Sequence, residues 1–190
     1  MHRYRMPAIF LDRDGTINLD CGYVSTIKTF IFINGVIDAM YKLIKMGFSL
    51  ILVTNQSGIA RGIFSVDQFM TLTRWMERTL AKNNVRLDGI YFCPHNPPNL
   101  VRVSYQLCNC RKPKPGMLLA AQKKFNINMS ASYMIGDTIA DMQAAKSAGV
   151  GKKILVRSGK KLPKEYNHNA DWVLDSLKDL PQYIQSKHLK

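Results

Sequence analysis

Residues 8–16 of this chain read AIFLDRDGT and combine a short apolar run with two carboxylates. The four apolar residues at 8–11 form a run typical of a buried strand, and the run ends at the carboxylate of Asp12. A second carboxylate follows at Asp14, and Gly15 allows the chain to turn sharply after it. We therefore expect both carboxylates to face one cavity at the end of the strand.

Two carboxylates one residue apart suit two chemical tasks on one substrate. A carboxylate that attacks phosphorus splits a difficult hydrolysis into two easier steps, while its neighbour transfers a proton. The same pair offers the hard oxygen ligands that Mg²⁺ prefers. The structural alternative is a turn or a helix cap, because aspartate favours both positions.

Outward from this stretch, short apolar runs alternate with segments of helical periodicity. Strands are predicted at residues 8–11, 48–53, 90–93, 133–135, 154–156 and 172–174. Helices are predicted at residues 35–46, 66–82, 115–125, 138–148 and 177–185. The alternation predicts an α/β fold with a doubly wound, Rossmann-like parallel sheet between two layers of helices. Ligands bind such sheets beyond the carboxyl ends of the strands, where most of the reactive side chains of this chain fall.

The composition is that of an ordinary folded protein and excludes several other classes. The chain has 190 residues, of which 46% are hydrophobic and 21% charged, so one domain over residues 1–190 is expected. Disordered, collagen-like and disulfide-scaffold chains are excluded. No apolar run approaches the ~18 residues of a membrane span, and the run near the N-terminus is shorter than the ~7–15 residues of a secretory signal. The expected location is the cytoplasm.

The charge balance is the unusual feature of the composition. Lys and Arg number 27 against 13 Asp and Glu, which gives a net charge of +14. A basic protein favours anionic partners such as nucleic acid, an acidic membrane surface or a phosphorylated small molecule. The excess is scattered, and no basic stripe with interleaved aromatic residues is present. A nucleic-acid-binding module is therefore only a remote alternative, and a solvated surface explains most of the charge.

Three of the four cysteines and one histidine form a pattern of possible metal ligands. Cys93 and His95 are separated by one residue, as are Cys108 and Cys110, and twelve residues lie between the two pairs. Three thiolates and an imidazole make a closed tetrahedral zinc site, which is structural because no open position remains. The alternative is two buried cysteines with surface neighbours. Cys21, the remaining cysteine, is expected to be a small buried thiol.

Four stretches of the sequence resemble, in order and in spacing, the four motifs of the haloacid dehalogenase (HAD) superfamily. They are FLDRDGT at 10–16, VTNQSG at 53–58, RKPKPG at 111–116 and IGDTIAD at 135–141. The resemblance covers most of the chain and implies a HAD-like α/β phosphatase. No insertion between the motifs is long enough for a large cap domain. A zinc-bound loop at about 93–110 would shape access instead, and Cys110 on zinc would fix where Arg111 and Lys112 point.

The resemblance also assigns roles residue by residue. It implies that Asp12 is the nucleophile and that Asp14 is the acid, then the base. Catalytic Mg²⁺ would be held by Asp12, Asp137 and the backbone carbonyl of Asp14, with Asp141 supporting this site from behind. Lys112 and the Thr54 hydroxyl would stabilise the phosphoryl group. Structural Zn²⁺ would be held by Cys93, His95, Cys108 and Cys110, and substrate would contact Asp20, Cys21, Gly22, Tyr23, Asn55, Gln56, Ser57, Arg111 and Thr138.

Within the superfamily, the chain resembles the phosphatases of D-glycero-D-manno-heptose 1,7-bisphosphate. This resemblance implies removal of the 7-phosphate, with the beta anomer favoured, on the route to ADP-heptose and the lipopolysaccharide core. Histidinol-phosphate phosphatase is the alternative activity. Thr138 departs from the pattern, because close relatives often carry a lysine there. The expected partner is a phosphorylated sugar, with no membrane and no nucleic acid, and the expected state is a monomer.

Overall fold

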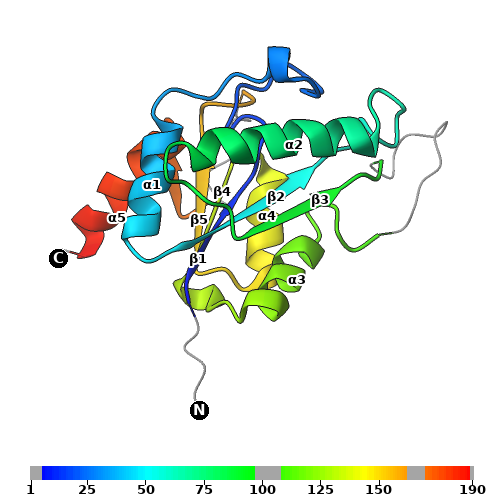
Figure 1. Cartoon of the computed structure of the whole chain (residues 1–190). Coiled ribbons are helices and arrows are strands. Elements are labelled where there is room, and N and C mark those ends of the chain that lie inside the picture. The colour runs from blue at the N-terminus through cyan, green and yellow to red at the C-terminus, as the bar shows by residue number, and fades with distance from the viewer. Residues whose placement is uncertain (1–5, 97–107, 162–169, 189–190) are drawn as a thin grey trace.

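A six-stranded parallel sheet lies at the centre of the computed structural model, which describes residues 6–96, 108–161 and 170–188 (Figure 1). The strands are β1 (Ala8–Leu11), β2 (Ser49–Asn55), β3 (Gly89–Cys93), β4 (Tyr133–Gly136), β5 (Lys152–Val156) and β6 (Trp172–Leu174). Their spatial order is β3-β2-β1-β4-β5-β6, and every pair is parallel. This is the predicted doubly wound sheet, and the strand order reverses between β1 and β4.

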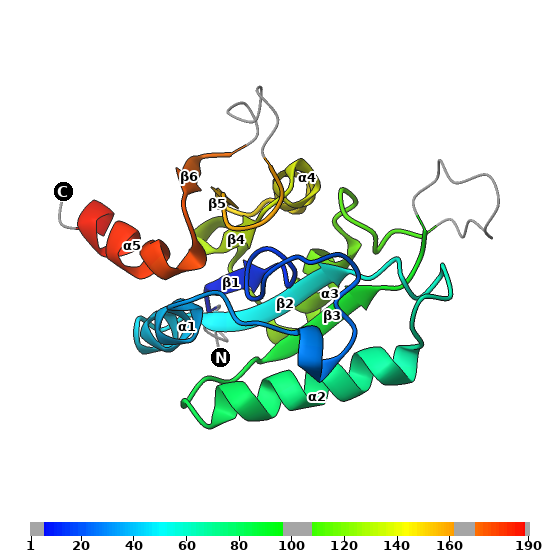
Figure 2. The same ribbon diagram turned by 90° about the horizontal axis from the view of Figure 1, so that it is seen from above.

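Helices cover both faces of the sheet and form two separate hydrophobic cores (Figure 2). The helices are α1 (Val36–Lys45), α2 (Val66–Ala81), α3 (Gly116–Phe125), α4 (Ile139–Ala148) and α5 (Leu180–His188). Apolar residues of α1, α2 and α5 pack on one face, and those of α3 and α4 pack on the other. The predicted three-layer arrangement is therefore confirmed.

Local sequence signals set most of the element boundaries. Ser65 and Gln68 form the expected capping box at the start of α2. Gly149 ends α4 in a left-handed conformation, with a φ of 75°. Four strands, β2 to β5, are longer than predicted, because the parallel ladder continues where the apolar pattern stops. β2 extends to Asn55 through its pairing with β3, and β5 begins at Lys152, opposite Tyr133 of β4.

The topology brings the ends of β1, β2 and β4 to one edge of the sheet. β1 is completely buried, and its last residue, Leu11, is in register with both Leu52 of β2 and Ile135 of β4. Crevices at such a reversal of strand order are where α/β proteins bind ligands. No large cap domain covers this edge in the part of the chain that the structure describes. Among the same residues, no helix has the length and apolar character needed to span a membrane.

Candidate active site

Asp12 and Lys112 form a buried ion pair at the centre of this edge. Lys112 Nζ lies 2.9 Å from Asp12 Oδ1 and 2.5 Å from Asp141 Oδ1, and it donates a third contact to the Val53 carbonyl. Burial, together with the charges of Asp141 and Asp137, raises the pKa of Asp12 to about 7 despite the nearby ammonium. Burial would lower the pKa of Lys112, but Asp12 and Asp141 outweigh it and raise this pKa. The lysine is thus held as a cation beside the predicted nucleophile.

Three carboxylates converge beside this lysine. Oxygen atoms of Asp12, Asp137 and Asp141 lie within 4.8 Å of one another. Burial raises the pKa of Asp137 to about 6, and the neighbouring charge of Asp141 adds to this effect. Carboxylates crowded in this way repel one another unless a cation lies between them. An all-oxygen donor set with this mutual repulsion fits a Mg²⁺ ion.

Asp141 is already engaged by protein groups on both of its oxygens. Its Oδ1 faces Lys112 Nζ, and its Oδ2 accepts from the backbone N–H and the hydroxyl of Thr138 at 3.1 and 2.5 Å. These contacts support the prediction that Asp141 orients the groups around the metal site and does not itself bind the metal ion. The proton of the Thr138 hydroxyl is committed to Asp141, although Thr138 itself lines the cavity.

Asp14 faces a set of hydrogen-bond donors instead of the carboxylate cluster. Arg13 Nε and Nη2 grip both of its oxygens at 2.9–3.2 Å, and Asn18 Nδ2 and Gln56 Nε2 each donate at 3.0 Å. The Arg13 side chain is only 1% exposed, and its Nη2 also donates to the Val24 carbonyl at 2.6 Å. Sequence reasoning missed Arg13, because its position between two aspartates predicts neither burial nor this fork-shaped contact.

The last residues of β2, together with Gln56, connect the two halves of the site. Asn55 Nδ2 donates to the Lys112 carbonyl, and Asn55 Oδ1 accepts from the Lys112 backbone N–H. Gln56 Nε2 donates both to Asp14 and to the Thr54 hydroxyl oxygen, at 3.0 and 2.9 Å. The Thr54 hydroxyl therefore keeps its own proton available for an acceptor in the cavity.

A cavity of about 470 Å³ opens over these groups. Its lining includes the predicted residues Asp12, Asp14, Asp20, Gly22, Tyr23, Thr54, Asn55, Gln56, Ser57, Arg111, Lys112, Asp137 and Thr138. It also includes Gly58, Arg61, Ala140 and Lys160, to which the sequence analysis assigned no role in the site. The basic character of Arg61 and Lys160 was visible in the sequence, but no pattern indicated that their side chains line the same cavity as Asp12 and Lys112.

Cys21 corrects one expectation about this cavity. The thiol is exposed rather than buried, and Cys21 is not among the residues that line the cavity. The reason is local: the Gly22 N–H donates to Asp20 Oδ1, which makes a tight turn with Cys21 at its apex. Gly22 and Tyr23 then adopt positive φ angles of 78° and 49°. The neighbours Asp20 and Tyr23 reach the cavity, whereas Cys21 does not.

The four predicted zinc ligands meet in space. Cys93 Sγ lies 3.8 Å from Cys108 Sγ and 3.5 Å from His95 Nδ1, and Cys110 Sγ lies 3.4 Å from His95 Nδ1. A tetrahedral ion with Zn–S distances of about 2.3 Å requires sulfurs about 3.8 Å apart. The observed spacing thus fits Zn²⁺. Residues 97–107 of the predicted zinc loop lie outside the described residues.

The thiols of this cluster differ in their pKa. Burial raises the pKa of Cys93 and, less strongly, that of Cys110. Burial acts in the same direction on Cys108, but hydrogen bonds, first of all from the backbone of Arg111, lower its pKa to about 7. Cys108 is therefore the thiol best prepared to bind a cation as a thiolate.

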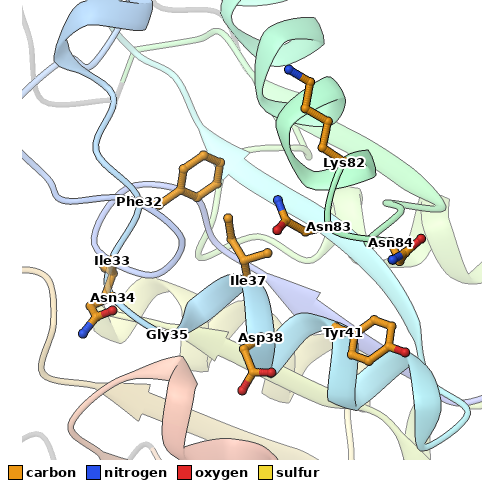
Figure 3. Close-up of a pocket in the computed structure, with 10 residues that line it drawn as sticks. All are labelled: Phe32, Ile33, Asn34, Gly35, Ile37, Asp38, Tyr41, Lys82, Asn83 and Asn84. Carbon is orange, nitrogen blue, oxygen red and sulfur yellow. The ribbon is translucent and has the colours of Figure 1, made fainter.

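A larger cavity, of about 640 Å³, lies away from this edge, between α1 and the end of α2 (Figure 3). Phe32, Ile37 and Tyr41 line one side of it, and Lys82 and Asn83 line the other. It brings together no cluster of catalytic or metal-binding side chains. Chemistry rather than volume therefore identifies the smaller cavity as the candidate active site.

Comparison with known proteins agrees with this geometry. A family model described as HAD-hydrolase-like matches residues 109–180. A D-glycero-beta-D-manno-heptose-1,7-bisphosphate 7-phosphatase of Escherichia coli K12 is 60% identical over 182 residues, which cover 96% of this chain and 95% of that protein. The chain belongs to the heptose-1,7-bisphosphate 7-phosphatase family. A Yersinia pestis member of this family is 59% identical over 96% of this chain and 97% of its own length.

A solved structure supports the same assignment. The D,D-heptose 1,7-bisphosphate phosphatase of B. bronchiseptica, complexed with magnesium and phosphate, superposes with a TM-score of 0.82 and 30% identity. The match covers 96% of this chain and 99% of that one. The predicted membership of the HAD superfamily is thereby confirmed, as is the resemblance to the heptose-bisphosphate phosphatases.

Proposed function

We propose that this chain hydrolyses the 7-phosphate of D-glycero-beta-D-manno-heptose 1,7-bisphosphate with the help of Mg²⁺. The observation that carries the proposal is the buried Asp12–Lys112 pair with Asp137, at the base of a cavity in a chain 60% identical to a phosphatase of that name. The product would enter the route to ADP-heptose and the lipopolysaccharide core. We also propose that the protein acts in the cytoplasm as a single-domain monomer.

The proposed chemistry has two steps that share the same residues. An Asp12 carboxylate oxygen attacks phosphorus and forms an acyl phosphate while the bond from phosphorus to the sugar oxygen breaks. Asp14 gives its proton to the departing sugar oxygen. It then takes a proton from water, which attacks the acyl phosphate, releases inorganic phosphate and restores Asp12.

The surroundings of Asp12 supply the charge that this chemistry needs. A phosphoryl group in transfer carries negative charge on three oxygens, which two nearby carboxylates would repel. Lys112 is fixed beside Asp12 by three contacts, and the Thr54 hydroxyl and the backbone after it can donate to these oxygens. Bound Mg²⁺, held by Asp12, Asp137 and the Asp14 carbonyl, would offset the remaining charge.

Arg111 is our candidate for recognition of the second, non-reacting phosphate. Its Nη1 donates to the His95 carbonyl at 3.0 Å, and it directly follows Cys110 of the cysteine cluster. This contact leaves Nη2 and Nε available to grip a phosphate through two parallel hydrogen bonds. Histidinol phosphate has a cationic ammonium at its far end, which Arg111 would repel.

The decisive experiment measures phosphate release from a panel of substrates in the presence of Mg²⁺. We expect kcat/KM for the heptose bisphosphate to exceed that for histidinol phosphate at least ~100-fold, which corresponds to about 2.7 kcal/mol. The variant Arg111→Ala should narrow this ratio mainly by harming the bisphosphate. Equal kcat/KM values for the two substrates would contradict the proposal and favour the histidinol-phosphate phosphatase activity instead.

A further inference from the structure

The segment that follows β5 folds back onto the carboxylate of Asp137. The Lys160 backbone N–H donates to Asp137 Oδ2 at 2.9 Å. Two residues earlier, the Ser158 hydroxyl donates to the Gly15 carbonyl at 2.8 Å, and so joins this segment to the turn that carries Asp12 and Asp14. Residues 158–160, called the Asp137 clamp below, therefore connect two parts of the active site that are more than a hundred residues apart.

Glycines make this close approach possible. A Cβ added to Gly159 would overlap Asp137 Oδ2 and lie 2.5 Å from both Cβ and Cγ of Asp137. A Cβ added to Gly15 would lie 2.5 Å from the same Oδ2 and 2.8 Å from the Gly159 Cα. Real Cβ atoms do not approach other heavy atoms this closely. A side chain at position 159 would therefore force Asp137 away from its present place.

We propose that the Asp137 clamp is a positioning element that reserves Oδ2 for the Lys160 N–H and leaves Oδ1 alone to bind the metal ion. The clamp thereby favours Mg²⁺ over Ca²⁺. Mg²⁺ requires single-oxygen ligands at 2.0–2.1 Å in near-octahedral order, whereas Ca²⁺ accepts carboxylates through both oxygens at longer distances. An Asp137 whose second oxygen is occupied can serve the first ion better than the second.

Hydrogen bonds to metal-binding carboxylates commonly tune affinity, and their loss costs about 10–100-fold in binding. The Lys160 bond is a backbone bond, so it does not depend on the side chain at position 160. This bond depends on the path of the backbone, and that path is possible because Gly159 has no side chain. The inference rests on the proposed function only through the requirement for Mg²⁺ at Asp12 and Asp137.

The test is a calorimetric titration of the protein, free of substrate and phosphate, with Mg²⁺ and separately with Ca²⁺. For Gly159→Ala we expect the Kd of Mg²⁺ to rise at least about tenfold. The Kd of Ca²⁺ should rise less, because an Asp137 released from the clamp can offer both oxygens. The milder variant Ser158→Ala loses one hydrogen bond, and we expect a smaller change in the same direction.

Two control variants distinguish the effect of the clamp from the effect of the Lys160 charge and from the effect of crowding at a glycine. Lys160→Ala removes the ammonium but keeps the backbone N–H, and should not weaken Mg²⁺ binding. Gly151→Ala is equally crowded, since its Cβ would overlap the Ser130 backbone, but position 151 does not contact Asp137. It should lower thermal stability and leave the Kd of Mg²⁺ unchanged.

The outcome does not depend on the identity of the substrate, because no substrate is present. The proposal fails if folded Gly159→Ala binds Mg²⁺ and Ca²⁺ with the wild-type ratio of affinities. It also fails if Gly151→Ala weakens Mg²⁺ binding as much as Gly159→Ala does. If Gly159→Ala does not fold, the ratio of Mg²⁺ to Ca²⁺ affinity is measured for Ser158→Ala instead. A ratio equal to that of the wild type then overturns the proposal.

Discussion

At the scale of single residues, the electrostatics of the site meet at Asp12. It touches the ammonium of Lys112, lies among the carboxylates of Asp137 and Asp141, and is nearly buried. With a pKa of about 7, Asp12 is partly protonated at neutral pH even beside Lys112, and a bound Mg²⁺ would favour the carboxylate form that acts as the nucleophile. Burial makes the ionised carboxylate less stable, but it also strengthens the attraction between Asp12 and Lys112, which offsets part of this penalty.

The variant Asp12→Asn should abolish turnover and leave the fold intact. The amide keeps the shape of the carboxylate but loses the nucleophile and one metal ligand. Steady-state phosphate release in Mg²⁺ and circular dichroism of the same preparation measure the two effects. Turnover within tenfold of the wild type would contradict the acyl-phosphate mechanism.

Arg13 is a second residue whose substitution has a distinctive expected result. Arg13→Lys keeps the charge but loses the fork that orients both oxygens of Asp14. We expect kcat for a sugar phosphate to fall at least about tenfold, part of the ~10²–10⁴-fold that a general acid supplies, with little change in KM. The loss should be smaller with p-nitrophenyl phosphate, whose leaving group needs little protonation.

The control for this variant is Arg86→Lys, at an exposed arginine outside the catalytic cavity. Its kinetics should match the wild type for both substrates. An equal loss of kcat on the two substrates for Arg13→Lys would mean that Arg13 supports the fold rather than proton transfer.

At the scale of elements, the cysteine cluster joins β3 to the segment that carries Lys112. Cys93 is the last residue of β3, and Cys110 is two residues before Lys112. The Lys114 side chain also donates to the Cys108 carbonyl at 2.8 Å. A metal ion on this cluster would therefore fix the direction in which Arg111 and Lys112 leave the cluster.

Cys110→Ser should lower the zinc content, the melting temperature and the apparent affinity for substrate. We expect KM to rise more than kcat falls, because Lys112 keeps its contacts with Asp12 and Asp141 once substrate is bound. Elemental analysis, thermal melting and kinetics measure the three effects, with the exposed Cys21→Ser as the matched control. Wild-type protein without zinc would remove the basis for this prediction.

At the scale of the whole molecule, the carboxylate cluster makes stability depend on pH. Asp12 and Asp137 have a pKa of about 7 and about 6 in the folded protein, against the ordinary value of 3.8. Between pH 3.8 and about 7 the folded state thus binds more protons than the unfolded state. Linkage then requires that these groups make the metal-free protein less stable as the pH rises through this window.

We expect the melting temperature of zinc-loaded protein without Mg²⁺ to decrease from pH 5 towards pH 7.5, and added Mg²⁺ to restore it most strongly at the upper end. Metal binding requires deprotonated carboxylates, so stabilisation by the ion grows as the pH rises. Asp12→Asn should flatten the curve measured without Mg²⁺. A melting temperature that rises through this window without Mg²⁺, in wild-type protein, would contradict the assigned pKa values.

The sequence by itself determined the order and kind of the elements and most of the site. Apolar runs such as residues 8–11 and 133–135 encode buried strands locally, and parallel strands must place their carboxyl ends together. For this reason the sequence alone places Asp12, Thr54 and Asp137 at one edge of the sheet. The cysteine cluster was found the same way, because ligand type and spacing reflect the coordination chemistry of the ion.

Only the tertiary structure decided which groups touch these residues. The fork of Arg13 on Asp14, the exposure of Cys21 and the fold-back of residues 158–160 onto Asp137 leave no pattern in the sequence. Each depends on the path of a loop, and loops carry no periodicity from which a direction could be read. The periodicity of apolar residues indicates which side of a helix or strand is buried. A hydrogen bond between residues 23 positions apart, such as Lys160 and Asp137, depends instead on how the folded chain brings the two residues together.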